Sequence, residues 1–179
     1  MDERDVEDID LLDLEDLIED LDHEGPTPEQ LHELYGVYLR DIVKTPLKFK
    51  LQNVKVNNQP SSHPICRGKH QTFEHIITRE SKHSGKRNFD VERANKIHWI
   101  KPILENSHDP RILYFESIHP QLRCNQFFYW YKSKGFIIIL REIKIGVILI
   151  TSFSVDRLDS TKYIKMHNAY EEAKKNPTS

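Results

Sequence analysis

The sequence predicts an α+β fold, in which helices pack on a small antiparallel sheet of four strands and an acidic helical appendage precedes them. Four β-rich segments separated by short turns occupy the C-terminal half of the 179-residue chain. Helical spacing of apolar residues dominates the N-terminal part, where acidic residues are concentrated. We therefore divide the chain into an acidic helical appendage at residues 1–46, a connecting segment at residues 47–71 and a body at residues 72–179.

The net charge of −2 conceals a strong asymmetry along the chain. Residues 1–35 carry fifteen Asp and Glu against one Arg, whereas residues 36–179 carry twenty-five Lys and Arg against thirteen Asp and Glu. A split of this kind is typical of an acidic tail on a body that binds nucleic acid, although a solvated disordered tail is the commoner explanation. We expect RNA as the partner of the body. The acidic arm could mask that surface or bind another protein.

Two features indicate a cytoplasmic protein that does not enter a membrane. The N-terminus is acidic, where a secretory signal would be basic. The apolar run at residues 136–140 is too short to cross a bilayer. Cys66 and Cys124 are too few for a disulfide framework, so we expect reduced thiols.

A zinc site is the alternative for these cysteines. His63, Cys66 and His70 follow the pattern H-x2-C-x3-H, and Cys124 could supply a fourth ligand. The paired CxxC halves of most zinc sites are missing, and isolated His and Cys groupings are more often surface residues. We therefore expect no metal and no cofactor.

Two helices are predicted in the appendage. Residues 5–21 place apolar side chains at partly helical spacing within an otherwise acidic segment. A second helix begins at Thr27-Pro28-Glu29-Gln30, a capping box with proline at the first helical position. Its apolar stripe consists of Leu31, Leu34, Tyr35, Tyr38, Leu39 and Ile42.

The segment between the appendage and the predicted sheet shows weaker patterns. Residues 47–51 alternate as a short strand would. A helix is expected at about residues 89–100, until Pro102 breaks or kinks it and can begin a further turn. Trp99 is expected to pack in the core rather than to stack on a ligand.

The predicted sheet comes from β-rich runs at residues 111–117, 125–133, 136–142 and 146–155. We interpret these runs as an antiparallel meander. The third run is continuously apolar, so it should be the central strand, buried on both faces, with the helices packed on one of them. A charged amphipathic helix is expected at about residues 156–175.

Residues 72–104 concentrate the side chains best suited to chemistry. They hold three His, seven Lys or Arg and one Trp, a mixture that suits phosphate binding and proton transfer better than a core. A strand or turn bearing His75 is expected to lead through the basic loop at residues 81–87 into a helix opened by Asn88 or Asp90. Cations would then gather near a helix N-terminus, where anions are already favoured. The stretch therefore predicts an anion site.

This stretch and the last predicted strand together form a recognisable series. The segments are Phe73-Glu74-His75-Ile76, residues 84–90 (SGKRNFD), Arg93-Ala94, residues 97–104 (IHWIKPIL) and Leu149-Ile150-Thr151-Ser152-Phe153. The series resembles the phage-associated nuclease-like domains that are grouped with barnase, EndoU, the colicin tRNases and RelE. The match spans roughly residues 72–158, about half of the chain. The resemblance implies a helix packed on a small antiparallel sheet, and cleavage of RNA without a metal.

Attack of the 2′-OH of RNA on the adjacent phosphate requires a base, an acid for the leaving 5′-oxygen and cations for the phosphorane. Histidine is the natural acid or base near neutral pH. The candidate catalytic residues are His75, His83, His98, Arg87 and Thr151. The candidate substrate-binding residues are Lys82, Lys86, Arg93, Lys101 and Ser152.

Within this set, we expect His75 to be the principal acid or base and one of the other two histidines to be its partner. Arg87 would stabilise the phosphate, and Thr151 would orient it from the end of the last strand. Structural roles stay open, because the arginines could instead pair with Glu74 or Glu92, and any one histidine could be a satisfied structural residue.

The leading interpretation is a metal-independent endoribonuclease that cleaves RNA, with tRNA among its possible targets. It would act as a toxin or defence effector. The alternative is a catalytically inactive RNA- or protein-binding module of the same fold, whose histidines are surface or core groups. Cleavage of RNA in the presence of EDTA would separate the two.

Overall fold

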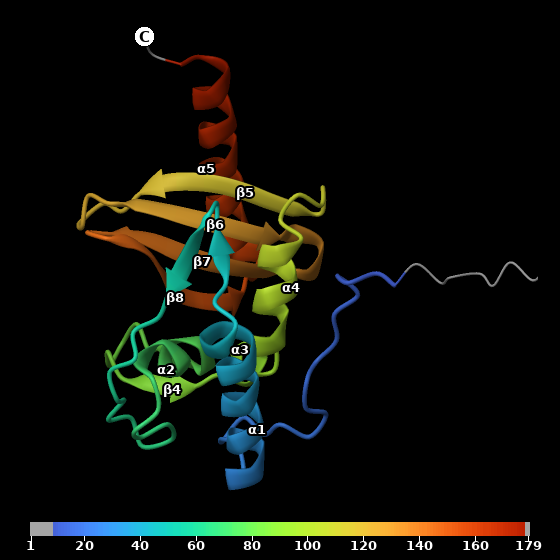
Figure 1. Cartoon of the computed structure of the whole chain (residues 1–179), viewed down its shortest axis with the longest axis vertical. Coiled ribbons are helices and arrows are strands. Elements are labelled where there is room, and N and C mark those ends of the chain that lie inside the picture. Colours follow the sequence, from blue (N-terminus) through green and yellow to red (C-terminus); the bar gives the residue numbers. More distant parts are fainter. Residues whose placement is uncertain (1–8, 178–179) are drawn as a thin grey trace, which may run out of the picture.

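The computed structural model describes residues 9–177, so residues 5–8 of the first predicted helix lie outside the described range. The described chain forms a six-stranded sheet, helices on both of its faces and a separate two-stranded hairpin (Figure 1). The helical elements are α1 (Pro28–Tyr38), the π-helical η1 (Leu39–Lys44), α2 (Gln71–Ile77), α3 (Val91–Ala94), the 3-10 turn η2 (Ile97–Trp99), α4 (Ile100–Glu105), the 3-10 turn η3 (Lys132–Lys134) and α5 (Arg157–Lys175). The strands are β1 (Lys48–Phe49), β2 (Gln52–Lys55), β3 (Thr78–Glu80), β4 (Arg87–Phe89), β5 (Ile112–Ile118), β6 (Asn125–Tyr131), β7 (Phe136–Ile143) and β8 (Gly146–Ser154).

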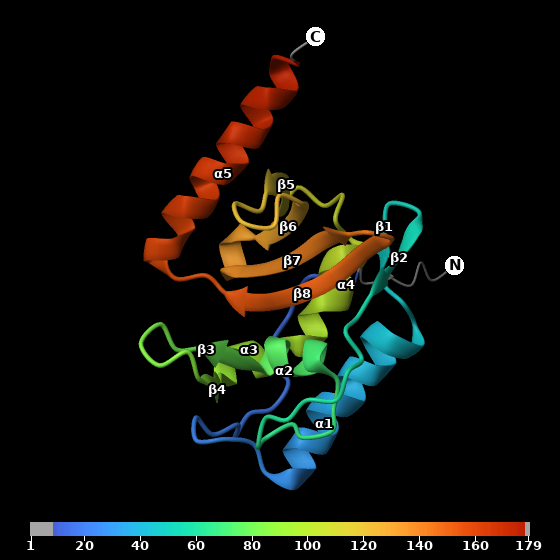
Figure 2. The same ribbon diagram turned by 90° about the vertical axis from the view of Figure 1, so that its left-hand side faces the viewer.

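The main sheet has the strand order β1-β2-β8-β7-β6-β5 and curls into a half-barrel (Figure 2). Strands β5 to β8 form the antiparallel meander that the sequence predicts. The prediction of a four-stranded sheet is nevertheless wrong, because β1 and β2 extend the sheet beyond β8. β2 pairs with β8 in parallel, which no hairpin pattern could indicate.

Strand β1 lies within the alternating run at residues 47–51 that predicts a short strand, whereas β2 carries little local signal. They contain two and four residues, and Phe49 and Val54 are their buried side chains. The turn between them consists of Lys50 and Leu51, and Lys50 adopts a left-handed conformation with φ of 51°. Glycine or asparagine usually marks such a turn in a sequence. Pairing with β8, rather than intrinsic strand preference, therefore determines this hairpin.

Helix α1 begins where the sequence predicts. The Thr27 hydroxyl accepts the N–H of Gln30, and the Gln30 side chain accepts the N–H of Thr27, which completes the capping box. The predicted apolar stripe continues from α1 into η1 and buries Leu34, Tyr38 and Ile42. The helix therefore packs on the body through the face that the sequence indicates.

Residues 9–24, here called the strap, contain no helix, so the first predicted helix is wrong over the described part of its range. The buried side chains of the strap are Leu12, Ile18 and Leu21. The body supplies hydrogen bonds to the strap backbone: the Asn95 amide binds both the N–H and the carbonyl of Ile18, and Trp99 Nε1 donates to Glu15 O. Dense acidic charge also disfavours a helix here, because like charges repel one turn apart.

The helix predicted at residues 89–100 is divided into α3, η2 and α4. Asp90 caps α3, since its carboxylate accepts the N–H of Arg93 at 3.0 Å. Asn95, whose side chain binds the strap, marks the first break. Pro102 lies in the first turn of α4, where an N–H has no helical partner, so it belongs to a further helical turn as the sequence allows.

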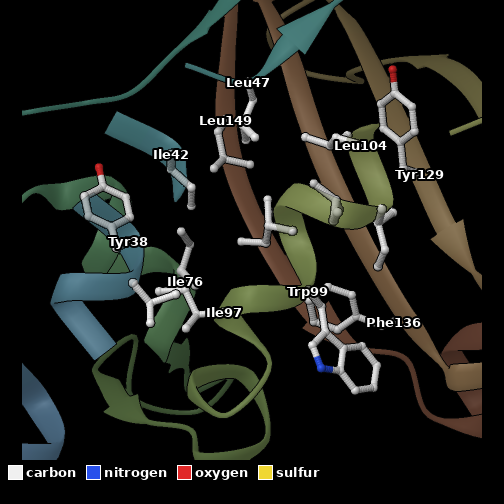
Figure 3. Packing of buried hydrophobic residues seen from close by; sticks show 14 of the residues in the cluster. Tyr38, Ile42, Leu47, Ile76, Ile97, Trp99, Leu104, Tyr129, Phe136 and Leu149 are labelled. Carbon is white, nitrogen blue, oxygen red and sulfur yellow. The ribbon is translucent and has the colours of Figure 1, made fainter. Parts of the chain in front are cut away.

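Apolar cores lie on both faces of the main sheet. Side chains from the strap, α1, η1, α2 and α4 share one cluster with the sheet, part of which is shown in Figure 3. On the opposite face, α5 packs over the meander (Figure 2). The predicted C-terminal helix is therefore present, but the prediction that the helices pack on one face of the sheet is wrong. The Tyr163 ring of α5 lies near the rings of Phe115, Phe128, Trp130 and Phe153. Across residues 9–177, no helix has the length and apolar character needed to cross a membrane.

Candidate active site

A cleft of about 620 Å³ lies where α2, the β3–β4 hairpin, α3, the end of β8 and the start of α5 come together. These elements meet on the left-hand side of Figure 2. The cleft is lined by His75, Arg79, Glu80, Lys82, Arg87, Asp90, Glu92, Arg93, Ile150, Thr151, Phe153, Ser154, Asp156, Asp159, Lys162 and Tyr163. Of the ten sequence-predicted site residues, five therefore share one cleft.

His75 lies on α2, not on the strand or turn that the sequence predicts. Its side chain is half-buried, and burial lowers its pKa below the usual value of about 6.5. The positive charge of Arg87 lowers the pKa of His75 further. The imidazole is therefore neutral at pH 7, which is the form required of a general base.

The Arg87 guanidinium is held in place by contacts with Thr78, Glu74 and Glu80. Its Nε donates to Thr78 Oγ1 at 2.9 Å, and its Nη2 donates to Thr78 O at 3.1 Å. The carboxylates of Glu74 and Glu80 lie 3.7 and 4.0 Å from the guanidinium. The pairing with Glu74 that the sequence leaves open is therefore present, and Arg87 Nη1 makes only the longer contact with Glu80.

Arg93 and Thr151 both bind the backbone that carries the imidazole. Thr151 Oγ1 donates to His75 O at 3.0 Å, and Arg93 Nη1 donates to Thr78 O at 3.0 Å. The same Nη1 lies 3.5 Å from His75 O and from Thr151 Oγ1. The Arg93 guanidinium also lies over the Phe153 ring, at 5.0 Å from its centroid, and burial lowers its pKa to about 10. Both side chains therefore fix the C-terminal end of α2.

The predicted anion site at a helix N-terminus is not formed in this arrangement. α3 is four residues long, and the Asp90 carboxylate already accepts the N–H of Arg93. A carboxylate in that position satisfies the helix start and repels a second anion. Cationic side chains, rather than backbone N–H groups, supply the positive charge of the cleft.

The other predicted residues lie outside the cleft, apart from Lys82. His83 is exposed in the turn between β3 and β4, and Lys86 lines a neighbouring cavity. His98 lies on η2 beside the strap, where burial lowers its pKa, and Lys101 pairs with Glu105 at 3.9 Å on α4. The Ser152 hydroxyl is buried without a hydrogen-bond partner among the described residues. The three histidines are therefore not brought together.

Charged residues of α5 complete the cleft, and the sequence gives no local sign of them. The cleft cations are Arg79, Lys82, Arg87, Arg93 and Lys162, and the cleft carboxylates are Glu80, Asp90, Glu92, Asp156 and Asp159. Lys162 and Tyr163 look in sequence like ordinary positions of an amphipathic helix. Only the packing of α5 against the end of β8 places them here.

The residues considered for zinc have other partners. His63 Nε2 donates to Arg87 O at 2.8 Å, His70 Nδ1 is 3.0 Å from the Tyr38 hydroxyl, and burial raises the pKa of the Cys66 thiol. Cys124 lies beside β6, at the turn after β5. Within residues 9–177, no three His, Cys, Asp or Glu side chains are grouped to hold a metal ion.

Comparison of the chain with protein-family models, curated proteins and solved structures finds no match. The fold and the cleft therefore describe the class of protein. It is an α+β protein whose cleft places one neutral imidazole beside two fixed guanidinium groups.

Proposed function

We propose that this protein is a metal-independent endoribonuclease that cleaves RNA by attack of the 2′-OH on the adjacent phosphate. The observation that carries the proposal is the cleft in which His75 lies with Arg87 and four further cations. An imidazole with a lowered pKa can accept a proton at neutral pH, and guanidinium groups can stabilise the charge of a phosphorane.

In this mechanism, His75 accepts the proton of the 2′-OH while the oxygen attacks the phosphorus. Arg87 bonds the non-bridging phosphate oxygens, and its contacts with Thr78 and Glu74 hold it in position before substrate binds. Arg79, Lys82 and Lys162 on the rim attract the neighbouring phosphates. The products are a 2′,3′-cyclic phosphate and a free 5′-hydroxyl.

The leaving 5′-oxygen requires a proton donor, and neither His83 nor His98 lines the cleft. Tyr163 and Lys162 meet this requirement: both line the cleft, and burial raises the pKa of Tyr163 to about 12, so it keeps its proton at neutral pH. Replacing Tyr163 with Phe and Lys162 with Met separately should identify the donor. Loss of the donor should lower the cleavage rate by about 10²-fold or more.

The resemblance to phage-associated nuclease-like domains supports this proposal. His75, Arg87, Arg93 and Thr151 belong to four separate segments of the resembling series, and all four line one cleft. These residues span 77 positions of the sequence, and a shared active site would explain why they meet in one cavity. A toxin or defence role, with tRNA among the targets, belongs to the same proposal.

One observation favours a second candidate, a module that binds RNA or protein without cleaving it. The cleft holds as many carboxylates as Lys and Arg side chains, and Arg93 and Thr151 are used to hold α2. A cleft with balanced charge attracts RNA less strongly than a basic one. Binding without cleavage is the behaviour expected of such a module.

Incubation of the purified protein with total tRNA in EDTA tests the proposal. Cleavage that leaves cyclic-phosphate ends is expected, and His75→Ala should lower its rate by about 10²-fold or more. His83→Ala is the matched control, because His83 is exposed in a turn outside the cleft. Equal rates for the two variants would remove His75 from the mechanism, and binding without cleavage would establish the module instead.

A further inference from the structure

A second cavity, of about 590 Å³, adjoins the His75 cleft across β4. Its lining residues are His23, Glu24, His63, Pro64, Ile65, Lys86, Arg87, Asn88 and Phe89. Arg87 lines both cavities, so an RNA strand whose phosphate lies in the cleft reaches the second cavity at this residue. The second cavity takes no part in the proton transfers described above.

The walls of this cavity differ chemically from those of the cleft. Phe89, Ile65 and Pro64 give it an apolar and partly aromatic lining, whereas Asn88 and His23 add groups that form hydrogen bonds. Lys86 and Arg87 supply the positive charge next to it. An apolar slot with a few polar groups and adjacent cations suits a flat, polar ring attached to a phosphate chain.

The His63 imidazole forms a rigid part of the wall. Its Nε2 is 2.8 Å from Arg87 O, which can only accept, so Nε2 carries the proton. Its Nδ1 accepts the N–H of Ile65 at 3.3 Å. Both nitrogens are therefore used in holding the segment between β2 and α2 against β4, and the cavity is formed before any ligand arrives.

We propose that this cavity is a nucleobase subsite, which takes one unpaired base of the RNA whose phosphate lies at Arg87. The base stacks on the Phe89 ring, and Asn88 bonds its edge. This inference rests on the proposed ribonuclease function and specifies its substrate: RNA with an unpaired base next to the reacting phosphate. A base inside a duplex cannot leave its stack without additional cost.

The strap has a place in the same subsite. His23 and Glu24, its last residues, line the cavity, whereas no residue of the strap lines the His75 cleft. The described part of the acidic arm therefore lies beside the base and not over the phosphate site. It borders the subsite rather than masking the cleft.

The test compares two RNA strands and two protein variants, all in a His75→Ala background so that no strand is cleaved. The first probe is a short single-stranded oligouridylate, and the second is the same strand with abasic sites, which keeps every phosphate. The first protein change is Phe89→Leu, which keeps an apolar side chain but removes the ring face. The second is Tyr170→Leu, a half-buried aromatic residue of α5 that lines neither cavity.

In titrations at fixed ionic strength, the oligouridylate should bind at least about tenfold more tightly than the abasic strand. Phe89→Leu should abolish that difference, and Tyr170→Leu should leave it intact. A difference between the strands that survives Phe89→Leu places base recognition elsewhere and overturns the subsite.

The design also separates the failure of the subsite from the failure of the proposed function. Equal binding of the two strands by the protein with Phe89 intact overturns the subsite, even if Phe89→Leu does not fold. If the unmodified protein still cleaves tRNA in EDTA, the ribonuclease proposal survives that result. If no strand binds and no RNA is cleaved, both proposals are overturned.

Discussion

The meander at residues 112–154 and the cleft layer at residues 71–94 are stabilised in different ways. Four strands of seven to nine residues hold the meander together by ladder hydrogen bonds, with buried apolar side chains on both faces. The cleft layer contains helices of seven and four residues and two strands of three. Elements this short are unstable alone, so side chains must fix their backbone.

Those fixing side chains are polar and charged residues of the candidate site. Arg87 and Arg93 both bind the carbonyl of Thr78, and Thr151 binds that of His75. A change at a meander residue that does not line the cleft should therefore alter stability alone. A change in the cleft layer, or at Thr151 at the end of β8, should alter stability and chemistry together. The two regions therefore differ in the expected effect of a substitution.

The largest effect is expected in the meander, for Phe136→Ala. Phe136 is fully buried at the start of β7, with its ring 5.4 Å from that of Trp99. Removing a buried phenyl ring should lower the free energy of unfolding by about 3–5 kcal/mol, measured by urea denaturation. Leu51→Ala is the control, because Leu51 is fully exposed and its loss should change stability by less than about 0.5 kcal/mol. Similar losses for the two variants would contradict the assignment of the core.

The next effect is expected in the cleft layer, for Arg87→Ala. If Arg87 binds the phosphorane, its loss should lower the RNA cleavage rate by about 10²–10³-fold. Arg157→Ala removes the same charge from an exposed position at the start of α5, outside the cleft. Cleavage assays at two salt concentrations should show a small and salt-dependent effect for Arg157. Equal losses would mean that general attraction for RNA, not a site, is being measured.

A third change tests the junction between the strap and the cleft layer. Asn95 is buried after α3, and its side chain makes hydrogen bonds of 2.7 and 2.9 Å to the backbone of Ile18. Asn95→Ala should lower the free energy of unfolding by about 1–3 kcal/mol, because buried backbone groups lose their partners. Asn168→Ala on the exposed side of α5 is the control. An unchanged urea midpoint for Asn95→Ala would mean that the strap is not held by this residue.

Strong local patterns explain why part of the fold could be predicted from sequence. The runs that became β5 to β8 contain enough β-branched and aromatic residues to identify them without tertiary contacts. The capping box at Thr27 and the length of α5 are equally local. β1, β2 and the strap depend instead on pairing or hydrogen bonds with distant residues, such as Val147 and Asn95, and no local pattern indicates these.

The candidate site follows the same division. His75, Arg87, Arg93 and Thr151 could be proposed because their residue types and order suggest phosphate chemistry, and the structure gathers them in one cleft. His83 and His98 have the same residue type, but a turn and a broken helix direct them elsewhere. The predicted helix breaks at Asn95, whose side chain bonds the distant strap, so the separation of His75 from His98 could not be predicted from spacing. Tyr163 enters the cleft through tertiary packing alone.

The smallest effect is expected for the dependence of folding stability on pH, which involves histidines outside the meander. Burial lowers the pKa values of His70, His75 and His98, and all three lie outside the meander. Below the usual pKa of about 6.5, the unfolded chain binds protons at these positions that the folded chain does not, so folding stability decreases. The stability they contribute is present above pH 6.5 and is lost as the pH falls through their lowered values. Urea midpoints measured from pH 7.5 to pH 5 should therefore fall, and His98→Gln should reduce the slope while His83→Gln, in an exposed turn, should not. A midpoint that is constant over this range would show that the three imidazoles are not desolvated in the folded protein.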